Sequence, residues 1–216
     1  MMKTKLILPI LIILIHAFDV YGINGRTSTE NTILVTGTNI TNIESTFITE
    51  RGTRGWGLTN YTMSIKKDDE FIFKVSQSTI TKTVLSNMCT AESGTRIDGE
   101  ISEKIVVKLP SWNNFANVSS DQQAKWRRFY TYVNSHEEEH VTVFSRYSQQ
   151  KLATFRTNAL ALRPRAIYSA GDDVATKLQE KLDEKVIDLH TEYMNAAETL
   201  SDEVDVGVTF RHPREF

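Results

Sequence analysis

The chain has 216 residues, of which 40% are hydrophobic and 24% are charged, a composition typical of a globular protein rather than of a disordered or polytopic membrane protein. The formal net charge is -2, so the chain lacks the basic field on which phosphate binding depends, and we expect no nucleic-acid partner. The single cysteine, Cys89, excludes an intrachain disulfide and any zinc site built from four cysteines.

The first 22 residues have the pattern of a signal peptide. Lys3 and Lys5 precede an apolar run from Leu6 to Ile15, and small residues follow near Gly22. This run is shorter than the roughly 20 residues that a membrane-spanning helix needs, and no later run is long enough either. We therefore predict cleavage after Gly22 and export of residues 23–216, which would be secreted, periplasmic or otherwise extracytoplasmic. An uncleaved N-terminal anchor is the alternative.

Residues 23–110 favour β-strands. Runs of β-branched and aromatic residues alternate there with clusters of Gly, Asn, Asp and Ser; the runs are TILVTG, STFITE, YTMSI, EFIFKV, STITKTVL and KIVVKL. We expect a small antiparallel sheet whose last strand ends at Pro110. A glycine-rich turn around Trp56, which includes Gly57, separates two of the runs, and because no helix follows it, it is not a phosphate-binding loop.

Residues 119–200 favour two long helices. Ser119 or Ser120 can cap a first helix from about residue 121 to about residue 160. Residues that would form its inward face recur at spacings of three and four, and they are Trp126, Phe129, Tyr130, Val133, His140, Phe144 and Tyr147. A second helix begins near Asp172 and carries one apolar stripe, made of Ala175, Leu178, Leu182, Val186, Leu189, Tyr193, Ala196 and Leu200.

The order of these segments predicts the fold class. Strands come first and helices second, and the tail at residues 201–216 has no clear period. This order is typical of an α+β domain. We expect residues 23–216 to form a single domain, in which a small antiparallel sheet is followed by two long helices.

One motif carries chemistry. His136-Glu137-Glu138-Glu139-His140 is an HExxH sequence inside the strongest helical pattern of the chain. At about 100° per residue, both histidines lie within about 40° of each other on one helix face, and Glu137 lies on the same side. Two histidines on one face predict a Zn2+ site, and Glu137 is then the general base that takes a proton from water. The alternative is a charged helix face that contains the motif by chance.

Three stretches resemble a known family. They are KLPSW at Lys108 to Trp112, WRRF at Trp126 to Phe129 and HEEEHVTVF at His136 to Phe144. They are similar to a family of predicted secreted zinc-dependent proteases, otherwise described as a domain of unknown function. The resemblance implies an exported zinc endopeptidase with a zincin-like HExxH on its first helix and a polypeptide as its substrate.

The resemblance also implies a third zinc ligand. In that family a Tyr-Asp-x-x-Thr-x-His-Gly segment follows the long helix, and its histidine is the natural third ligand. The nearest match here, residues 204–213, keeps Asp205, Thr209 and His212 but lacks the Tyr and the Gly. The resemblance therefore implies His212 as the third ligand and Asp205 as a residue that orients a ligand histidine.

Several alternatives stay open. His190 and Glu192 on the second helix are competing third ligands, since a Glu would give a site of two histidines and a glutamate. Tyr193 is expected in the core, with hydrogen-bond donation to a reaction intermediate as its second reading. The competing functions are a non-catalytic exported binding protein, with a structural zinc or no zinc, and a zinc hydrolase of a non-peptide amide.

Overall fold

A computed structural model of the chain describes residues 23, 27–43, 56–85, 88–206, 208, 211 and 215–216. The strands before the long helices are β1 (Ser28–Val35), β2 (Leu58–Ser64), β3 (Lys66–Lys67), β4 (Glu70–Phe71), β5 (Phe73–Val75), β6 (Thr81–Leu85), β7 (Met88–Glu92), β8 (Thr95–Ile97) and β9 (Ser102–Trp112). The helices α2 (Ser120–Ala161) and α3 (Val174–Asp205) follow, with β10 (Arg165–Tyr168) between them. This order confirms the predicted α+β fold class.

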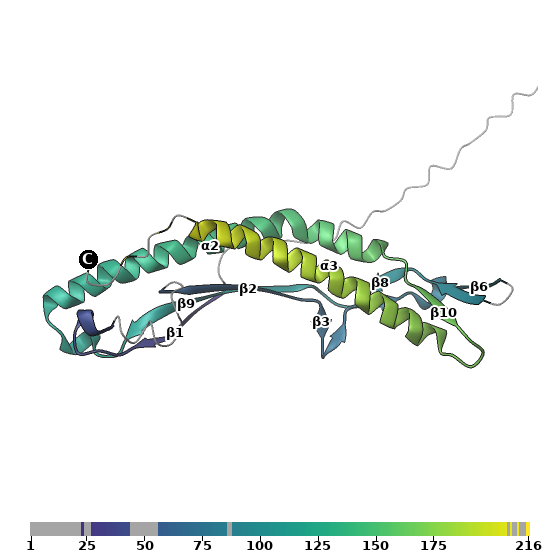
Figure 1. Cartoon of the computed structure of the whole chain (residues 1–216), viewed down its shortest axis with the longest axis horizontal. Coiled ribbons are helices and arrows are strands. Elements are labelled where there is room, and N and C mark those ends of the chain that lie inside the picture. Colours follow the sequence, from purple (N-terminus) through teal and green to yellow (C-terminus); the bar gives the residue numbers. More distant parts are fainter. Residues whose placement is uncertain are drawn as a thin grey trace, which may run out of the picture.

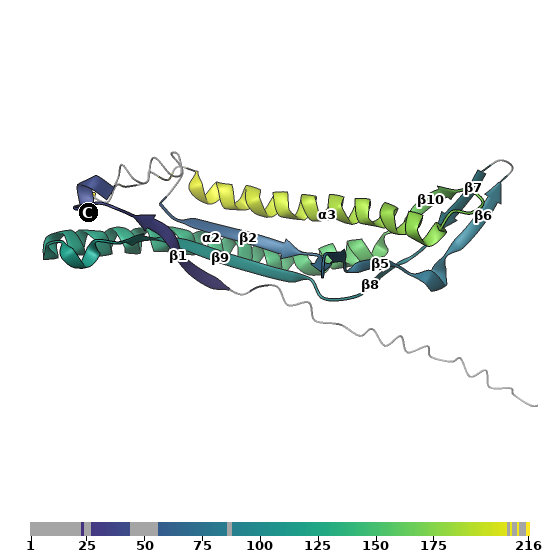
Figure 2. The ribbon, with the colours of Figure 1, turned by 90° about the horizontal axis from the view of Figure 1, so that it is seen from below.

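The two helices form an antiparallel pair that lies along one side of the strands (Figure 1). One sheet, in the order β1-β9-β2, runs beside α2. A second sheet, in the order β10-β7-β6, lies at the end where α2 leads into α3 (Figure 2). Two short pairs, β3-β4 and β5-β8, complete the strands of the described residues.

The central strand β9 joins two neighbours of opposite direction. It pairs antiparallel with β2, from Leu58 opposite Lys108 to Ser64 opposite Ser102, and parallel with β1. The prediction that the last strand ends at Pro110 is wrong, because β9 continues to Trp112. Since the pairing with β2 stops at Lys108, the strand has a neighbour on one side only at Pro110, and proline is tolerated at such a position.

Helix α2 begins where the sequence predicts. Ser119 is its N-cap, and the Ser119 hydroxyl accepts a hydrogen bond from the backbone N–H of Gln122 at 3.4 Å. The 42 residues of α2 make it about 63 Å long, so it passes beside most of the strands. Its buried face carries the predicted aromatic residues, except that Tyr130 is half-buried.

Helix α3 extends further than predicted. Asp173 caps it through hydrogen bonds from the N–H groups of Ala175 and Thr176, and the helix continues to Asp205. The tail was expected to begin at residue 201. The apolar stripe stops there because the last turn of α3 presents two polar residues, Ser201 and Asp205, to the histidines of the HExxH motif on α2.

The core lies between the helix pair and the strands. Leu178, Leu182 and Val186 of α3 are fully buried, as the predicted stripe requires, whereas Leu200 is 38% exposed. Tyr193 is buried in this core, as expected. No helix among the described residues has the length and apolar character needed to cross a membrane.

The four-residue strand β10 was not predicted. It pairs antiparallel with β7, with Ala166 opposite Ala91, and both of these side chains are buried. A strand of this length shows no useful period of its own, and its position depends on a partner more than 70 residues away in the sequence.

Candidate metal centre

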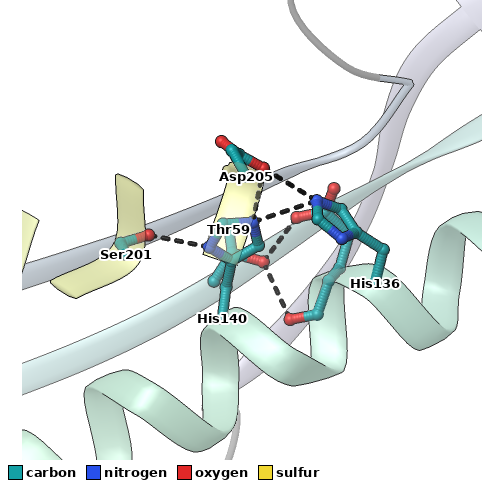
Figure 3. Close-up of polar contacts among 6 residues, drawn as sticks. Thr59, His136, His140, Ser201 and Asp205 are labelled. Carbon is teal, nitrogen blue, oxygen red and sulfur yellow. Dashed lines mark hydrogen bonds and ion pairs between the residues drawn. The ribbon is translucent and has the colours of Figure 1, made fainter. Parts of the chain in front are cut away.

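Two imidazole rings converge in the middle of α2. His136 and His140 are each 7% exposed, and their Nε2 atoms lie 3.2 Å apart, with the ring planes at 86° (Figure 3). The spacing of four residues places both side chains on one helix face, as the sequence predicts. Two buried ring nitrogens that point at each other form a pair of donors for one ion.

A carboxylate from α3 completes this group. The Oδ1 atom of Asp205 lies 2.9 Å from Nε2 of His136 and 3.4 Å from Nε2 of His140 (Figure 3). Among the His, Cys, Asp and Glu side chains of the described part of the chain, His136, His140 and Asp205 thus form a group that could hold a metal ion. Asp205 therefore contacts the same Nε2 atoms that face each other, and from this position its carboxylate could bind the same ion as the two histidines.

The dimensions of this triangle suit a small divalent ion. Its three edges measure 3.2, 2.9 and 3.4 Å. Ligand atoms bound to a tetrahedral zinc ion are separated by about 3.3 to 3.5 Å, so each edge is within about half an ångström of the value required. Two imidazoles and one carboxylate are also ligand types that zinc accepts. The side chain of Asp205 is 48% exposed, so the group is open to solvent on the α3 side.

The state of His140 favours ligand binding. Burial lowers the pKa of His140 below its usual value, and the nearby His136 lowers it too, while Asp205 acts in the opposite direction. A neutral imidazole has a lone pair for a metal. The Nδ1 atom of His140 lies 2.7 Å from the hydroxyl of Ser201, so with Nε2 free for a metal, Nδ1–H donates to that oxygen and fixes the ring.

The side chain of Glu137, on α2, is held by a hydrogen bond from a neighbouring strand. It is 4% exposed, and its Oε2 atom accepts a hydrogen bond of 2.7 Å from the hydroxyl of Thr59 on β2. Gly57 lies against the same side chain: a Cβ atom added there would be 2.3 Å from Oε1 of Glu137. The buried carboxylate of the motif therefore has a defined position beside the two histidines.

The other predicted ligands have different positions. His212 lies outside the described residues. The Nε2 atom of His190 is 2.9 Å from the carbonyl oxygen of Met63, and Glu192 is exposed. His190 is also 15 residues from Asp205 on the same helix, a separation of about 22 Å. Neither His190 nor Glu192 joins the group formed by His136 and His140.

The sequence did not single out three residues that shape the site, Ser201, Gly57 and Thr59, and it suggested for Asp205 only the role of orienting a histidine. Ser201 and Asp205 are four residues apart, a spacing that places both on one helix face, but the expected end of the helix near residue 200 concealed it. Gly57 was expected to serve only as part of a turn. Thr59 had no signal in the sequence, because its contact with Glu137 depends on where β2 meets α2.

The fold and this group of ligands define an α+β protein with a candidate metal centre on its central helix. The chain matches the family described as "Bacterial protein of unknown function (DUF922)" over residues 34–196, and it belongs to that family. The matched region contains His136, Glu137 and His140 and ends before Ser201. No curated protein and no solved structure matches the chain.

Proposed function

We propose that this protein is an exported zinc-dependent endopeptidase in which His136, His140 and Asp205 hold the ion and Glu137 is the general base. The observation that supports this proposal most strongly is the triangle of two imidazole nitrogens and one carboxylate oxygen beside a buried glutamate. It combines the ligands of a zinc site with a carboxylate from the same helix turn, which is the arrangement that hydrolysis by an activated water requires.

The roles of the residues follow from chemistry. A zinc ion bound there would lower the pKa of a water molecule and polarise the substrate carbonyl. Glu137 takes a proton from the attacking water, whose oxygen bonds to the carbonyl carbon, and delivers it to the leaving nitrogen as the C–N bond breaks. Thr59 and Gly57 keep the carboxylate of Glu137 in one position while this proton moves. Ser201 orients His140.

The number of protein ligands separates this proposal from a non-catalytic binding protein. Three protein ligands leave one position for water, whereas four close the site and make the metal structural. His212, which the family resemblance implies as a ligand, is the natural candidate for a fourth. The effect of His212→Ala on zinc content, compared with that of Asp205→Ala, therefore shows which of them is a ligand.

The test measures zinc and cleavage on the same samples. Purified protein, with Glu137→Gln and His140→Ala variants, is analysed for metal content and for cleavage of a generic unfolded protein. Glu139→Gln is the matched control, because it changes the same residue type in the same motif on an exposed part of the helix.

The expected pattern is one zinc per chain with cleavage in the parent protein and in Glu139→Gln. Zinc is lost in His140→Ala, and it is retained without cleavage in Glu137→Gln. Zinc without cleavage in the parent protein would favour the binding protein. Cleavage of small amides but not of polypeptides would favour a hydrolase of non-peptide amides. A folded, metal-free parent protein would overturn the proposal.

A further inference from the structure

Ile23, the first residue after the predicted cleavage site, is fixed to α2 at both ends of its backbone. Its N–H donates a hydrogen bond of 2.9 Å to the hydroxyl of Ser148, and its carbonyl accepts one of 3.3 Å from the side-chain amide of Gln149. Its side chain is partly buried against the hydrophobic core. Ser148 itself is fully buried, so the nitrogen of Ile23 points into the protein.

A carboxylate lies directly behind Ser148. The Ser148 hydroxyl donates to Oε2 of Glu103 on β9 at 2.7 Å. The other oxygen of Glu103 accepts hydrogen bonds from the hydroxyls of Tyr61 on β2 and Tyr193 on α3. We call Ser148, Gln149 and Glu103 the Ile23 socket. The socket thus links α2 to the sheet and, through Tyr193, to α3.

Among the residues that the structure describes, the Glu103 carboxylate has hydroxyl partners and no cationic one. Burial, together with Glu103 itself, raises the pKa values of Tyr61 and Tyr193 well above the usual phenol range, so both stay neutral donors. Tyr147 of α2, whose hydroxyl donates to the carbonyl of Tyr193, is also neutral, because burial raises its pKa. No ion pair of Glu103 occurs among the described residues. A half-buried carboxylate of this kind gains from a nearby cation.

We propose that the Ile23 socket binds the new amino terminus that cleavage after Gly22 creates on Ile23. Before cleavage the nitrogen of Ile23 is a neutral amide with one hydrogen, which Ser148 already accepts. After cleavage it is an ammonium group with three. The two hydrogen bonds through Ser148, of 2.9 and 2.7 Å, place this nitrogen no more than 5.6 Å from Oε2 of Glu103. Removal of the leader then places a positive charge near the Glu103 carboxylate, joined to it through the Ser148 hydroxyl.

The attraction between these two charges has a defined dependence on pH. An opposite charge at this range raises the pKa of an amino group by about one unit or more above its usual 7.7–8.0. Because the pKa is raised in the folded protein, the added stability is fully present below the usual amino pKa and disappears as the pH rises through the higher folded value. The inference depends on the proposed cleavage site and does not depend on zinc or catalysis.

The experiment begins with N-terminal sequencing of the exported protein, which should start at Ile23. Two chains are then compared: one that begins at Ile23, and one with Gly-Ser added before Ile23, which moves the ammonium group out of the socket. Each is made with Glu103, with Glu103→Gln, and with the control Glu100→Gln, since Glu100 is exposed three residues earlier. The measurements are the pKa of the terminal amino group, by its pH-dependent reaction with an amine reagent, and urea unfolding from pH 6 to 10.

In the chain that begins at Ile23 we expect the pKa of the amino group to be raised by at least about one unit. It should also react more slowly than in the extended chain. Both effects are expected to vanish in Glu103→Gln and to persist in Glu100→Gln. An ordinary amino pKa in the chain that starts at Ile23, or a natural terminus elsewhere, would overturn the proposal. If Glu103→Gln does not fold, the comparison of the two parent chains still decides the question. Zinc content measured on the same chains shows separately whether the proposed function stands.

Discussion

Replacement of Gly57 by Ala measures how firmly Glu137 is held. The backbone angle of Gly57 is outside the left-handed region, so Ala introduces no backbone strain, and its effect is steric. The new Cβ would lie 2.3 Å from Oε1 of Glu137 and 2.7 Å from its Cδ and Cγ atoms. An ordinary contact of a Cβ atom is 3.4 Å or more, so the carboxylate must move by about 1 Å. A shift of this size breaks its 2.7 Å hydrogen bond with Thr59.

The cost of this shift has two parts. Overpacking of a well-packed region costs about 1 to 3 kcal/mol, and loss of a hydrogen bond to an ionised carboxylate costs about 1.5 to 3 kcal/mol. We therefore expect Gly57→Ala to lower the free energy of unfolding by roughly 2.5 to 6 kcal/mol, measured by urea denaturation on metal-free protein. Bound zinc should be retained by the folded protein, because the histidines are not displaced.

Two further variants isolate the hydrogen bond. Thr59→Val keeps the shape of the side chain and removes the donor, so it should cost about 1.5 to 3 kcal/mol. Thr62→Val is the control, since Thr62 is exposed on the same strand and should change stability by no more than about 0.5 kcal/mol. If Gly57→Ala costs less than about 1 kcal/mol, the carboxylate of Glu137 moves aside freely, and our account of its fixed position is incorrect.

Three other variants test the ligands and the core. Loss of a residue that only hydrogen-bonds to a metal ligand typically weakens metal binding by about 10 to 100-fold. Asp205→Ala should weaken zinc binding by more than this, measured by competition with a chelator, whereas Asp202→Ala, at an exposed position, should not weaken it. Because burial lowers the pKa of His140, metal-free protein should lose stability as the pH falls from about 6.5 towards the lower folded value, and urea unfolding of His140→Gln should show a flatter profile. Leu182→Ala, at a fully buried position, should cost about 2 to 5 kcal/mol in urea unfolding, compared with less than about 1 kcal/mol for half-exposed Ile187→Ala.

The features that the sequence predicted well are those with a local period. The region of α2 shows a repeat of three and four from Trp126 to Tyr147 and has a serine cap, and its limits were predicted within a residue or two. The pairing of His136 with His140 follows from helix geometry alone. These features depend on residues near each other in the chain, and no distant partner is needed to explain them.

The features that were missed depend on distant partners. Asp205 was expected to orient a histidine, but its direct contact with His136, 69 residues away, depends on the length of α3 and on the packing of α3 against α2. The parallel pairing of β1 with β9 likewise joins segments more than 75 residues apart. Pro110 was predicted to end the strand, because the sequence does not show that the pairing of β2 with β9 ends at Lys108, two residues before the proline. Where a contact between distant segments determines the position of a residue, the local periodic pattern does not predict it.

The position of Asp205 on the last turn of α3 has a mechanical consequence. The two helices are connected through β10 at one end, and the ligands meet at the other end of α3. An ion held by His136 and Asp205 would cross-link the chain over 69 residues. A covalent cross-link over a loop of that length restricts the unfolded chain by about 4 kcal/mol. Chelation would therefore lower the free energy of unfolding by about that amount, while the contacts of Asp205 with His136 and of Ser201 with His140 still hold the end of α3 on α2.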